Sequence, residues 1–187
     1  MDKIGETIKE QRLKAGLTLK ELAALIGTTS SYLSQVEHNK TIPSLPVLKE
    51  IADALNTKIS YILGEEIAEE TKSNYVVIKK DERKTVKSFG EGLKLQFLST
   101  LDKNNRFEPT IHVLAPFAIS GTPPYQHEGQ EFVMCLKGKI KLYLSNTQII
   151  LAEGDTCYFD SNMEHSFENV VETDESEILC VSCPGFF

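Results

Sequence analysis

Two histidines and one glutamate stand out as residues that could bind a metal ion or a ligand. His127 and Glu131 lie four residues apart, so in an extended segment both side chains point to the same face. His165 belongs to a second polar stretch, residues 160–169, further along the chain. Two imidazoles and one carboxylate with open coordination positions can hold iron(II), manganese, nickel or zinc. If the fold brings these three side chains together, they form a candidate metal site.

The segments around these residues have the pattern of β-strands. From Tyr75 onward the apolar period changes from 3.6 to 2, and the runs are short and separated by turn residues. This pattern predicts an antiparallel sandwich or barrel, with a tight hairpin turn at Lys137-Gly138. Strands are expected at residues 75–78, 93–97, 110–114, 131–136, 139–144, 148–151, 156–159 and 178–183.

The first third of the chain has helical periodicity instead. Leu22, Ala23 and Ile26 continue an apolar stripe at helical spacing. Thr18 and Glu21 stand three residues apart just where this stripe begins, which is the signature of a capping box at a helix start. Other helices are expected over residues 3–15, 44–55 and 59–63.

A further helix is expected directly after Gly27. Leu33 and Val36 would face back to the preceding helix, while Ser31 and Gln35 fall on the opposite side. Two short helices joined through one glycine, with an outer face of small hydrogen-bonding residues, are the pattern of a DNA-reading helix-turn-helix.

Residues 1–63 resemble the phage-repressor type of helix-turn-helix domain, the XRE or Cro/C1 family. The resemblance implies a five-helix, lambda-repressor-like DNA-binding domain over residues 1–64, in which Arg12 pairs with Glu37 to hold two helices together. The matching positions are Leu17-Thr18, Glu21-Leu22-Ala23, Gly27, Tyr32-Leu33-Ser34, Glu37, Pro43 and residues 51–55.

The same resemblance assigns the contacts with DNA. Ser30, Ser31 and Gln35 would reach base edges, and a glutamine can read adenine through two hydrogen bonds. The resemblance assigns the phosphate contacts to Thr29, Lys40 and Thr41. Such contacts position the domain without specifying sequence.

Charge is distributed unevenly along the chain. Residues 1–63 carry eight Lys and Arg against seven Asp and Glu, whereas residues 64–187 carry twelve against twenty. DNA affinity must therefore come from a few placed groups and from dimerisation rather than from a strong basic field. The acidic stretch over residues 65–74 is expected to be a linker.

Compartment and membrane association follow from composition. The chain has no apolar run long enough to span a membrane and no apolar segment of a secretory signal near its N-terminus. We therefore expect a cytoplasmic protein without membrane contact, whose four cysteines are free thiols.

Residues 75–187 resemble the cupins, which implies a double-stranded β-helix (jelly-roll barrel). Two motifs carry the likeness, one from Gly121 to Gly138 and the other from Gly154 to Asn169. In cupins such motifs bring three histidines and a glutamate together around a divalent metal. His127, Glu131 and His165 match three of these positions, and Tyr125 occupies the fourth.

Together the two resemblances point to the XRE–cupin transcription regulators of bacteria. They imply a homodimer that binds a palindromic operator on double-stranded DNA and a barrel that binds a small-molecule effector. Cys135 has the same strand parity as Glu131 and is therefore also expected to line the effector pocket. The expected lining is Tyr125, His127, Glu131, Cys135 and His165.

Three alternatives stay open at the level of sequence. The absence of a histidine at the fourth ligand position allows a metal-free barrel in which the three polar side chains hydrogen-bond one another or hold the effector. The chain could also be a metal-dependent cupin enzyme with an accessory DNA-binding domain. In a third interpretation the helical domain binds protein rather than DNA.

Overall fold

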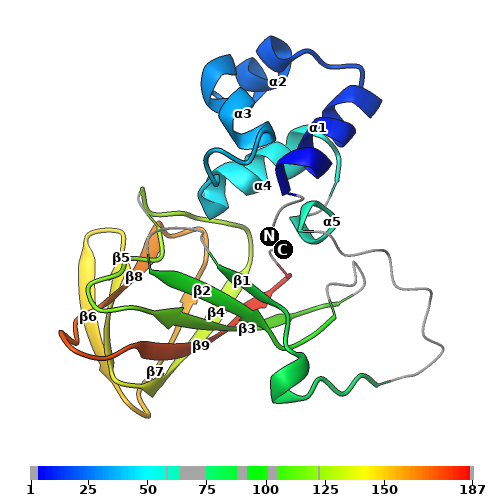
Figure 1. The fold of residues 1–187 in the computed structure, drawn as a ribbon. Coiled ribbons are helices and arrows are strands. Elements are labelled where there is room, and N and C mark those ends of the chain that lie inside the picture. The colour runs from blue at the N-terminus through cyan, green and yellow to red at the C-terminus, as the bar shows by residue number, and fades with distance from the viewer. Residues whose placement is uncertain are drawn as a thin grey trace. The chain divides into compact units, whose positions relative to one another are not determined.

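The computed structural model describes residues 4–57, 59–63, 75–87, 92–100, 105–121 and 123–185. The chain divides near residue 71 into two compact units, one helical and one built of strands (Figure 1). The expected linker over residues 65–74 lies entirely outside the described residues. Among the described residues, no helix is long and apolar enough to cross a membrane.

The helical unit follows the expected pattern, with one difference. Its first four helices run close to the predicted ranges, but the predicted fifth helix is a single turn of four residues. Ile8, Leu22, Leu33 and Ile51 are fully buried and form the centre of its core. The helices are α1 (Ile4–Lys14), α2 (Leu19–Leu25), α3 (Ser30–Glu37), α4 (Leu45–Ala54) and α5 (Ile59–Ile62).

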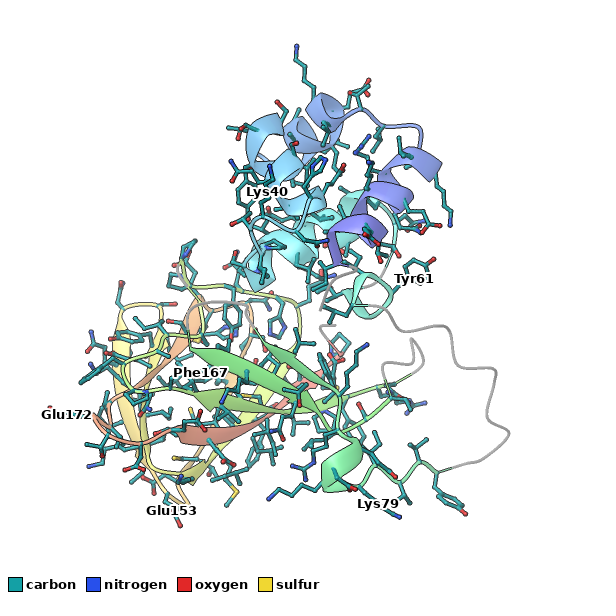
Figure 2. The ribbon with its side chains drawn as sticks, in the orientation of Figure 1. Lys40, Tyr61, Lys79, Glu153, Phe167 and Glu172 are labelled. Carbon is teal, nitrogen blue, oxygen red and sulfur yellow. The ribbon has the colours of Figure 1, made fainter. Side chains whose placement is uncertain are left out.

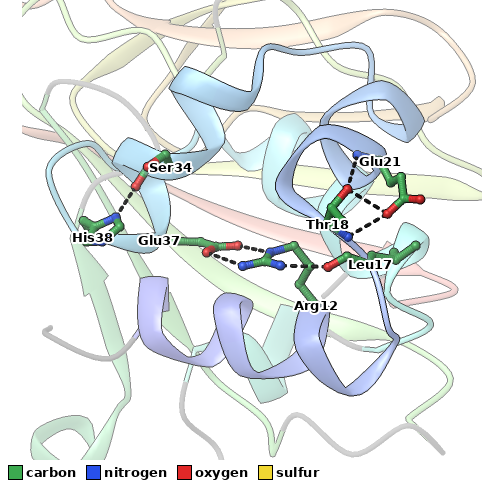
Figure 3. Close-up of polar contacts among 7 residues, drawn as sticks. All are labelled: Arg12, Leu17, Thr18, Glu21, Ser34, Glu37 and His38. Carbon is green, nitrogen blue, oxygen red and sulfur yellow. Dashed lines mark hydrogen bonds and ion pairs between the residues drawn. The ribbon is translucent and has the colours of Figure 1, made fainter.

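Side-chain caps fix where α2 and α3 begin, and Figure 3 shows the cap of α2. The Thr18 hydroxyl accepts a hydrogen bond from the Glu21 N–H, and the Glu21 carboxylate accepts one of 2.8 Å from the Thr18 N–H. The Thr29 hydroxyl caps α3 by accepting from the Tyr32 N–H at 3.1 Å. These contacts satisfy backbone donors that a helix start otherwise leaves unpaired, and they confirm the predicted capping box.

A buried ion pair joins α1 to α3. The Arg12 guanidinium donates to both carboxylate oxygens of Glu37, at 2.5 and 2.9 Å, and also to the Leu17 carbonyl at 2.7 Å (Figure 3). The two side chains are only 8% and 1% exposed. The same two helices also pack closely at Gly5 of α1, where an added Cβ would lie 2.3 Å from the carbonyl oxygen of Val36 on α3. The ion pair locks α3 to α1.

The second unit is built of two antiparallel sheets. One has six strands in the order β1-β2-β3-β9-β4-β7, and the other has three in the order β6-β5-β8. The chain passes from the first sheet to the second between β4 and β5, at Gly138, whose φ is +79°. The strands are β1 (Thr85–Lys87), β2 (Leu93–Phe97), β3 (Glu108–Leu114), β4 (Gln130–Lys137), β5 (Lys139–Leu144), β6 (Thr147–Ala152), β7 (Thr156–Asp160), β8 (His165–Asn169) and β9 (Ser176–Cys183).

The two sheets enclose an apolar core. Alternation along the strands buries every second residue of β2, β5 and β9, as expected for sheets with one face toward a core. Phe167 of β8 is fully buried between the sheets, whereas Glu153 and Glu172 lie at the periphery (Figure 2). This helix-turn-helix unit followed by a β-rich, cupin-like unit agrees with the predicted fold class at that level.

Two features of the predicted strand pattern were wrong. Tyr75–Ile78 is not a strand, and Tyr75, Val76 and Val77 are 76%, 52% and 71% exposed. Their β-branched and aromatic side chains favour extended backbone, but a strand also needs a partner ladder. Conversely, β1 and β8 were not predicted. Three polar residues of β8 are buried, and this hides the usual alternation: His165, Ser166 and Asn169.

The Arg12–Glu37 pair gives a first testable prediction. We expect Glu37→Gln to lower the free energy of unfolding of the helical unit by about 3 kcal/mol, because it leaves a buried guanidinium without its counter-charge. Asp53→Asn is the matched control, since it breaks an ion pair with Lys49 in which the carboxylate is 60% exposed. That change should cost less than about 1 kcal/mol. Equal effects of the two substitutions in urea unfolding would contradict the structural role of the pair.

Candidate functional site

Three side chains converge between the sheets at one end of β4 and β8. Glu131 lies on β4, His165 begins β8, and His127 precedes β4 in a loop held by a 2.9 Å hydrogen bond from its N–H to the Ser161 carbonyl. One ligand atom from each of the three lies within 4.8 Å of the others. Their side chains are only 8%, 3% and 0% exposed for His127, Glu131 and His165. The structure therefore brings together the three residues that the sequence singled out; we call them the His–Glu cluster.

Backbone carbonyls orient both imidazoles. His165 Nδ1 lies 2.7 Å from the Met163 carbonyl oxygen, and His127 Nδ1 lies 3.1 Å from that of Glu128. A carbonyl can only accept, so each Nδ1 carries a proton. Both Nε2 atoms face Glu131 Oε2, at 3.2 Å from His127 and 3.5 Å from His165. His165 Nε2 is buried without a hydrogen-bond partner among the described residues.

Glu131 carries a negative charge in this setting. Burial raises the pKa of its carboxyl, but the contacts with the imidazoles of His127, His165 and His112 outweigh burial and lower the pKa to about 2. The Cys180 thiol on β9 also hydrogen-bonds Glu131, and its own pKa is raised well above the ordinary range by burial and by that carboxylate. The group is therefore an ionised carboxylate facing two imidazole nitrogens, which is a donor set for a cation.

Tyr125 occupies the place of a fourth ligand but makes a different contact. It pairs with His165 through two backbone hydrogen bonds of 2.8 and 3.1 Å, and the two rings meet edge to face with centroids 4.5 Å apart. Its hydroxyl lies 3.5 Å from the Ser120 hydroxyl, and burial raises its pKa well above the ordinary value. Tyr125 is thus a neutral phenol that packs against His165.

A close backbone approach holds the loop between His127 and Glu131. Gly129 has a φ of +101°, and a Cβ added there would lie 2.1 Å from the Cys183 carbonyl oxygen. Its own carbonyl accepts a 2.9 Å hydrogen bond from the Ser161 N–H. Only glycine fits both this conformation and this space, so the residue fixes the spacing between the two ligand positions.

Cys135 is not part of the cluster. It is fully buried and faces the interior, as its strand parity predicted. However, it lies four residues beyond Glu131 along β4, and its thiol points to the carbonyls of Lys137 and Gly138, at 3.6 and 3.7 Å. Burial raises its pKa. The thiol beside the cluster is that of Cys180 instead.

Sequence reasoning missed two residues near the cluster, Cys180 and His112. His112 on β3 is 4% exposed, and its ring lies edge to face with Phe167 at 5.9 Å. Strand periodicity alone could show that His112 shares a face with Thr110 and Leu114. It could not show which face of that strand is interior, because the strand is buried at nearly every position.

The helical unit presents a second candidate surface, on α3. Its N-terminal turn and outer side carry the exposed residues Thr29, Ser30, Ser31 and Gln35, while Lys40 is exposed and Thr41 half-buried just beyond the helix. The capping role of Thr29 uses an oxygen lone pair and leaves its hydroxyl proton to donate. The six residues assigned to DNA therefore share one accessible region, which Figure 2 marks at Lys40.

Comparison with protein families gives two separate matches along the chain. The helix-turn-helix family matches residues 8–62, and the cupin domain family matches residues 110–182. The first range contains α3 and the buried ion pair, and the second contains all three members of the His–Glu cluster.

Similar proteins span nearly the whole chain. The HTH-type transcriptional regulator PuuR of Escherichia coli is 24% identical over 165 residues, which cover 88% of this chain and 86% of that protein. The crystal structure of a transcriptional regulator from Vibrio cholerae superposes with a TM-score of 0.69 at 21% identity, over 97% of this chain and 95% of that one. Hydroxypropylphosphonic acid epoxidase from S. wedmorenis has a TM-score of 0.52 at 19% identity, with 97% of each chain covered.

The two structural matches show a shared fold, and that fold occurs in both a regulator and an enzyme. The sequence matches are more specific, because they join the helix-turn-helix and cupin families in one regulator of similar length. The chain therefore contains a helix-turn-helix domain and a cupin domain, and it is homologous to HTH-type transcriptional regulators.

Proposed function

We propose that this transcriptional regulator binds a palindromic operator as a homodimer, and that its jelly-roll barrel binds a small-molecule effector at a divalent metal ion held by His127, Glu131 and His165. The helical domain, of lambda-repressor type, would span residues 1–64 and the cupin domain residues 75–187. The observation that carries the proposal is the convergence of three buried donor atoms within 4.8 Å.

The donor set supports a metal ion on chemical grounds. Each Nδ1 proton is directed to a carbonyl, so an imidazole in its neutral form turns an Nε2 lone pair to the ionised carboxylate and shares no proton with it. A divalent cation between the three groups would satisfy all of them at once. Orientation of each imidazole by a carbonyl on its other nitrogen is also the usual outer support of metal-binding histidines.

The kind of metal follows from the ligand atoms. Nitrogen and oxygen donors with no thiolate suit iron(II), manganese, nickel or zinc. Since Tyr125 is a neutral phenol engaged with Ser120, the cluster supplies three ligands and leaves coordination positions open. We propose that these positions receive the effector. Of the sequence-assigned lining, Tyr125 and the cluster stay in the proposed pocket and Cys135 lies outside it.

DNA recognition is proposed for α3 and the residues flanking it. Gln35, Ser31 and Ser30 would contact base edges, while Thr29, Lys40 and Thr41 would contact phosphates. Two copies of α3 can enter successive major grooves only if their centres lie about 34 Å apart, which requires a dimer. An effector would control DNA binding by binding more tightly to one arrangement of that dimer than to another.

The metal proposal predicts a defined stoichiometry. Protein purified without chelator or nickel resin should contain about one divalent ion per chain by elemental analysis. His127→Ala should lose most of it, because two remaining ligands bind far more weakly. His38→Ala is the matched control, since His38 is exposed and lies in the other unit. Metal-free wild-type protein that also fails to take up added zinc, iron(II), manganese or nickel would contradict the metal and leave the cluster as a hydrogen-bonded or effector-binding group.

The DNA proposal predicts different consequences for base and phosphate contacts. On an operator obtained by in vitro selection, Gln35→Ala should weaken the free energy of DNA binding by about 1–3 kcal/mol and relax the sequence preference at one base pair. Lys40→Ala should weaken binding to all sequences alike and reduce the salt slope by about one. Gln148→Ala, at an exposed position on β6, serves as the control. Should Gln35→Ala and Ser31→Ala both leave binding unchanged, α3 is not the recognition helix.

A further inference from the structure

His112 on β3 has a buried ring nitrogen for which the described residues provide no hydrogen-bond partner. It is 4% exposed, and its Nδ1 is buried with no partner in the part of the chain that the structure describes. An unsatisfied buried donor or acceptor costs about 1–3 kcal/mol. Such an atom calls for an explanation, and a bound ligand is one.

The ring of His112 faces the interior of the barrel. Its direct cross-strand neighbours are Leu95 on β2 and Ile178 on β9. Directly opposed residues on adjacent strands point to the same face of a sheet, and both neighbours are fully buried. Phe167, from the opposite sheet, meets the His112 ring edge to face at 5.9 Å.

A short path connects His112 with the His–Glu cluster. The ring centroids of Phe167 and His165 lie 6.3 Å apart, so the Phe167 ring lies next to the imidazoles of both His112 and His165. On the sheet side, Cys180 is one interior position from Ile178, the neighbour of His112, and its thiol hydrogen-bonds Glu131. The charge of Glu131 is also felt at His112. His112 and the cluster therefore border the same interior space.

We propose that His112 is a second recognition point for the effector, binding through Nδ1 an uncharged polar group of a molecule whose other end ligates the metal at the His–Glu cluster. This inference rests on the proposed metal site and adds the chemistry of the molecule that reaches it.

The surroundings define the two ends of that molecule. Burial lowers the pKa of His112 to about 4, so the ring is neutral at physiological pH and suits a hydroxyl or amide rather than an ion. A divalent metal with Glu131 leaves one net positive charge at the cluster, which an anionic group of the ligand would neutralise. The metal-binding end is then a carboxylate, and the ligand class is a short carboxylic acid that bears a hydroxyl or amide group.

The stability of the metal-free protein provides the first test. His112→Phe should raise the midpoint of thermal unfolding of the full chain by a few degrees, because it replaces an unpaired polar atom with an apolar ring of similar shape. Ser176→Ala is the matched control: this serine is equally buried, but its hydroxyl bonds Asn169 at 2.7 Å, so its loss should lower the midpoint. A lower midpoint for His112→Phe, or for His112→Leu if the first variant does not fold, would show that His112 is a structural residue and overturn the proposal.

Ligand binding provides the second test. Cobalt(II) is added to wild-type and His112→Phe protein, and its visible spectrum reports binding of short carboxylic acids to the metal. Acids of two to five carbons are compared with and without a hydroxyl group. At least one hydroxy acid should bind wild-type protein about three- to tenfold more tightly than its parent acid, and this preference should disappear in His112→Phe while the parent acid binds both proteins equally.

The outcomes separate the two proposals. Equal cobalt uptake with no hydroxyl preference in any pair of acids would overturn the role of His112 and leave the metal site intact. No cobalt uptake by the wild-type protein would overturn the metal site, and the inference about His112 with it. His112→Gln, which keeps a side chain able to hydrogen-bond, should retain part of the preference.

Discussion

Glu131 imposes the main constraint on the β unit, because an ionised carboxylate that is 3% exposed must be compensated within the protein. Its compensation comes from two imidazoles and a thiol that reach it from the loop before β4, from β8 and from β9. Each of these segments must therefore be held in register. A barrel of only apolar residues would tolerate small shifts between strands, whereas this one has a polar centre that depends on their alignment.

Backbone contacts near the cluster maintain that alignment. The close approach of Gly129 to Cys183 fixes the loop that carries His127, and the two backbone hydrogen bonds between Tyr125 and His165 fix the start of β8. These contacts also explain why Tyr125 fits the site without acting as a ligand. Its backbone positions His165, and its ring packs against that imidazole.

Sequence reasoning was successful where local rules determine the outcome. The capping box at Thr18, the stripe of α2 and the facing of Glu131 and Cys135 all follow from periodicity and side-chain chemistry, and the structure has them. The errors arose where distant segments decide. Tyr75–Ile78 has strand-forming residues but no strand, and β8 has polar residues that point inward because the cluster and Asn169 are there. Cys135 shares a face with Glu131, yet a face extends along the whole strand, and only the fold shows that its thiol points to the turn at Gly138.

The cupin fold alone does not decide between a regulator and an enzyme, since the structural likenesses include one of each. A metal with open positions can bind a carboxylate in either kind of protein, and catalysis additionally requires groups that move protons or electrons at the bound molecule. The polar residues around this cluster are poorly suited to proton transfer at neutral pH: burial keeps Tyr125 and Cys180 protonated and His112 neutral. Such groups can recognise a ligand by hydrogen bonds without changing it. The proposed sensor role requires an interior that binds its ligand without changing it, because the bound molecule must persist long enough to shift the balance between two states of the regulator.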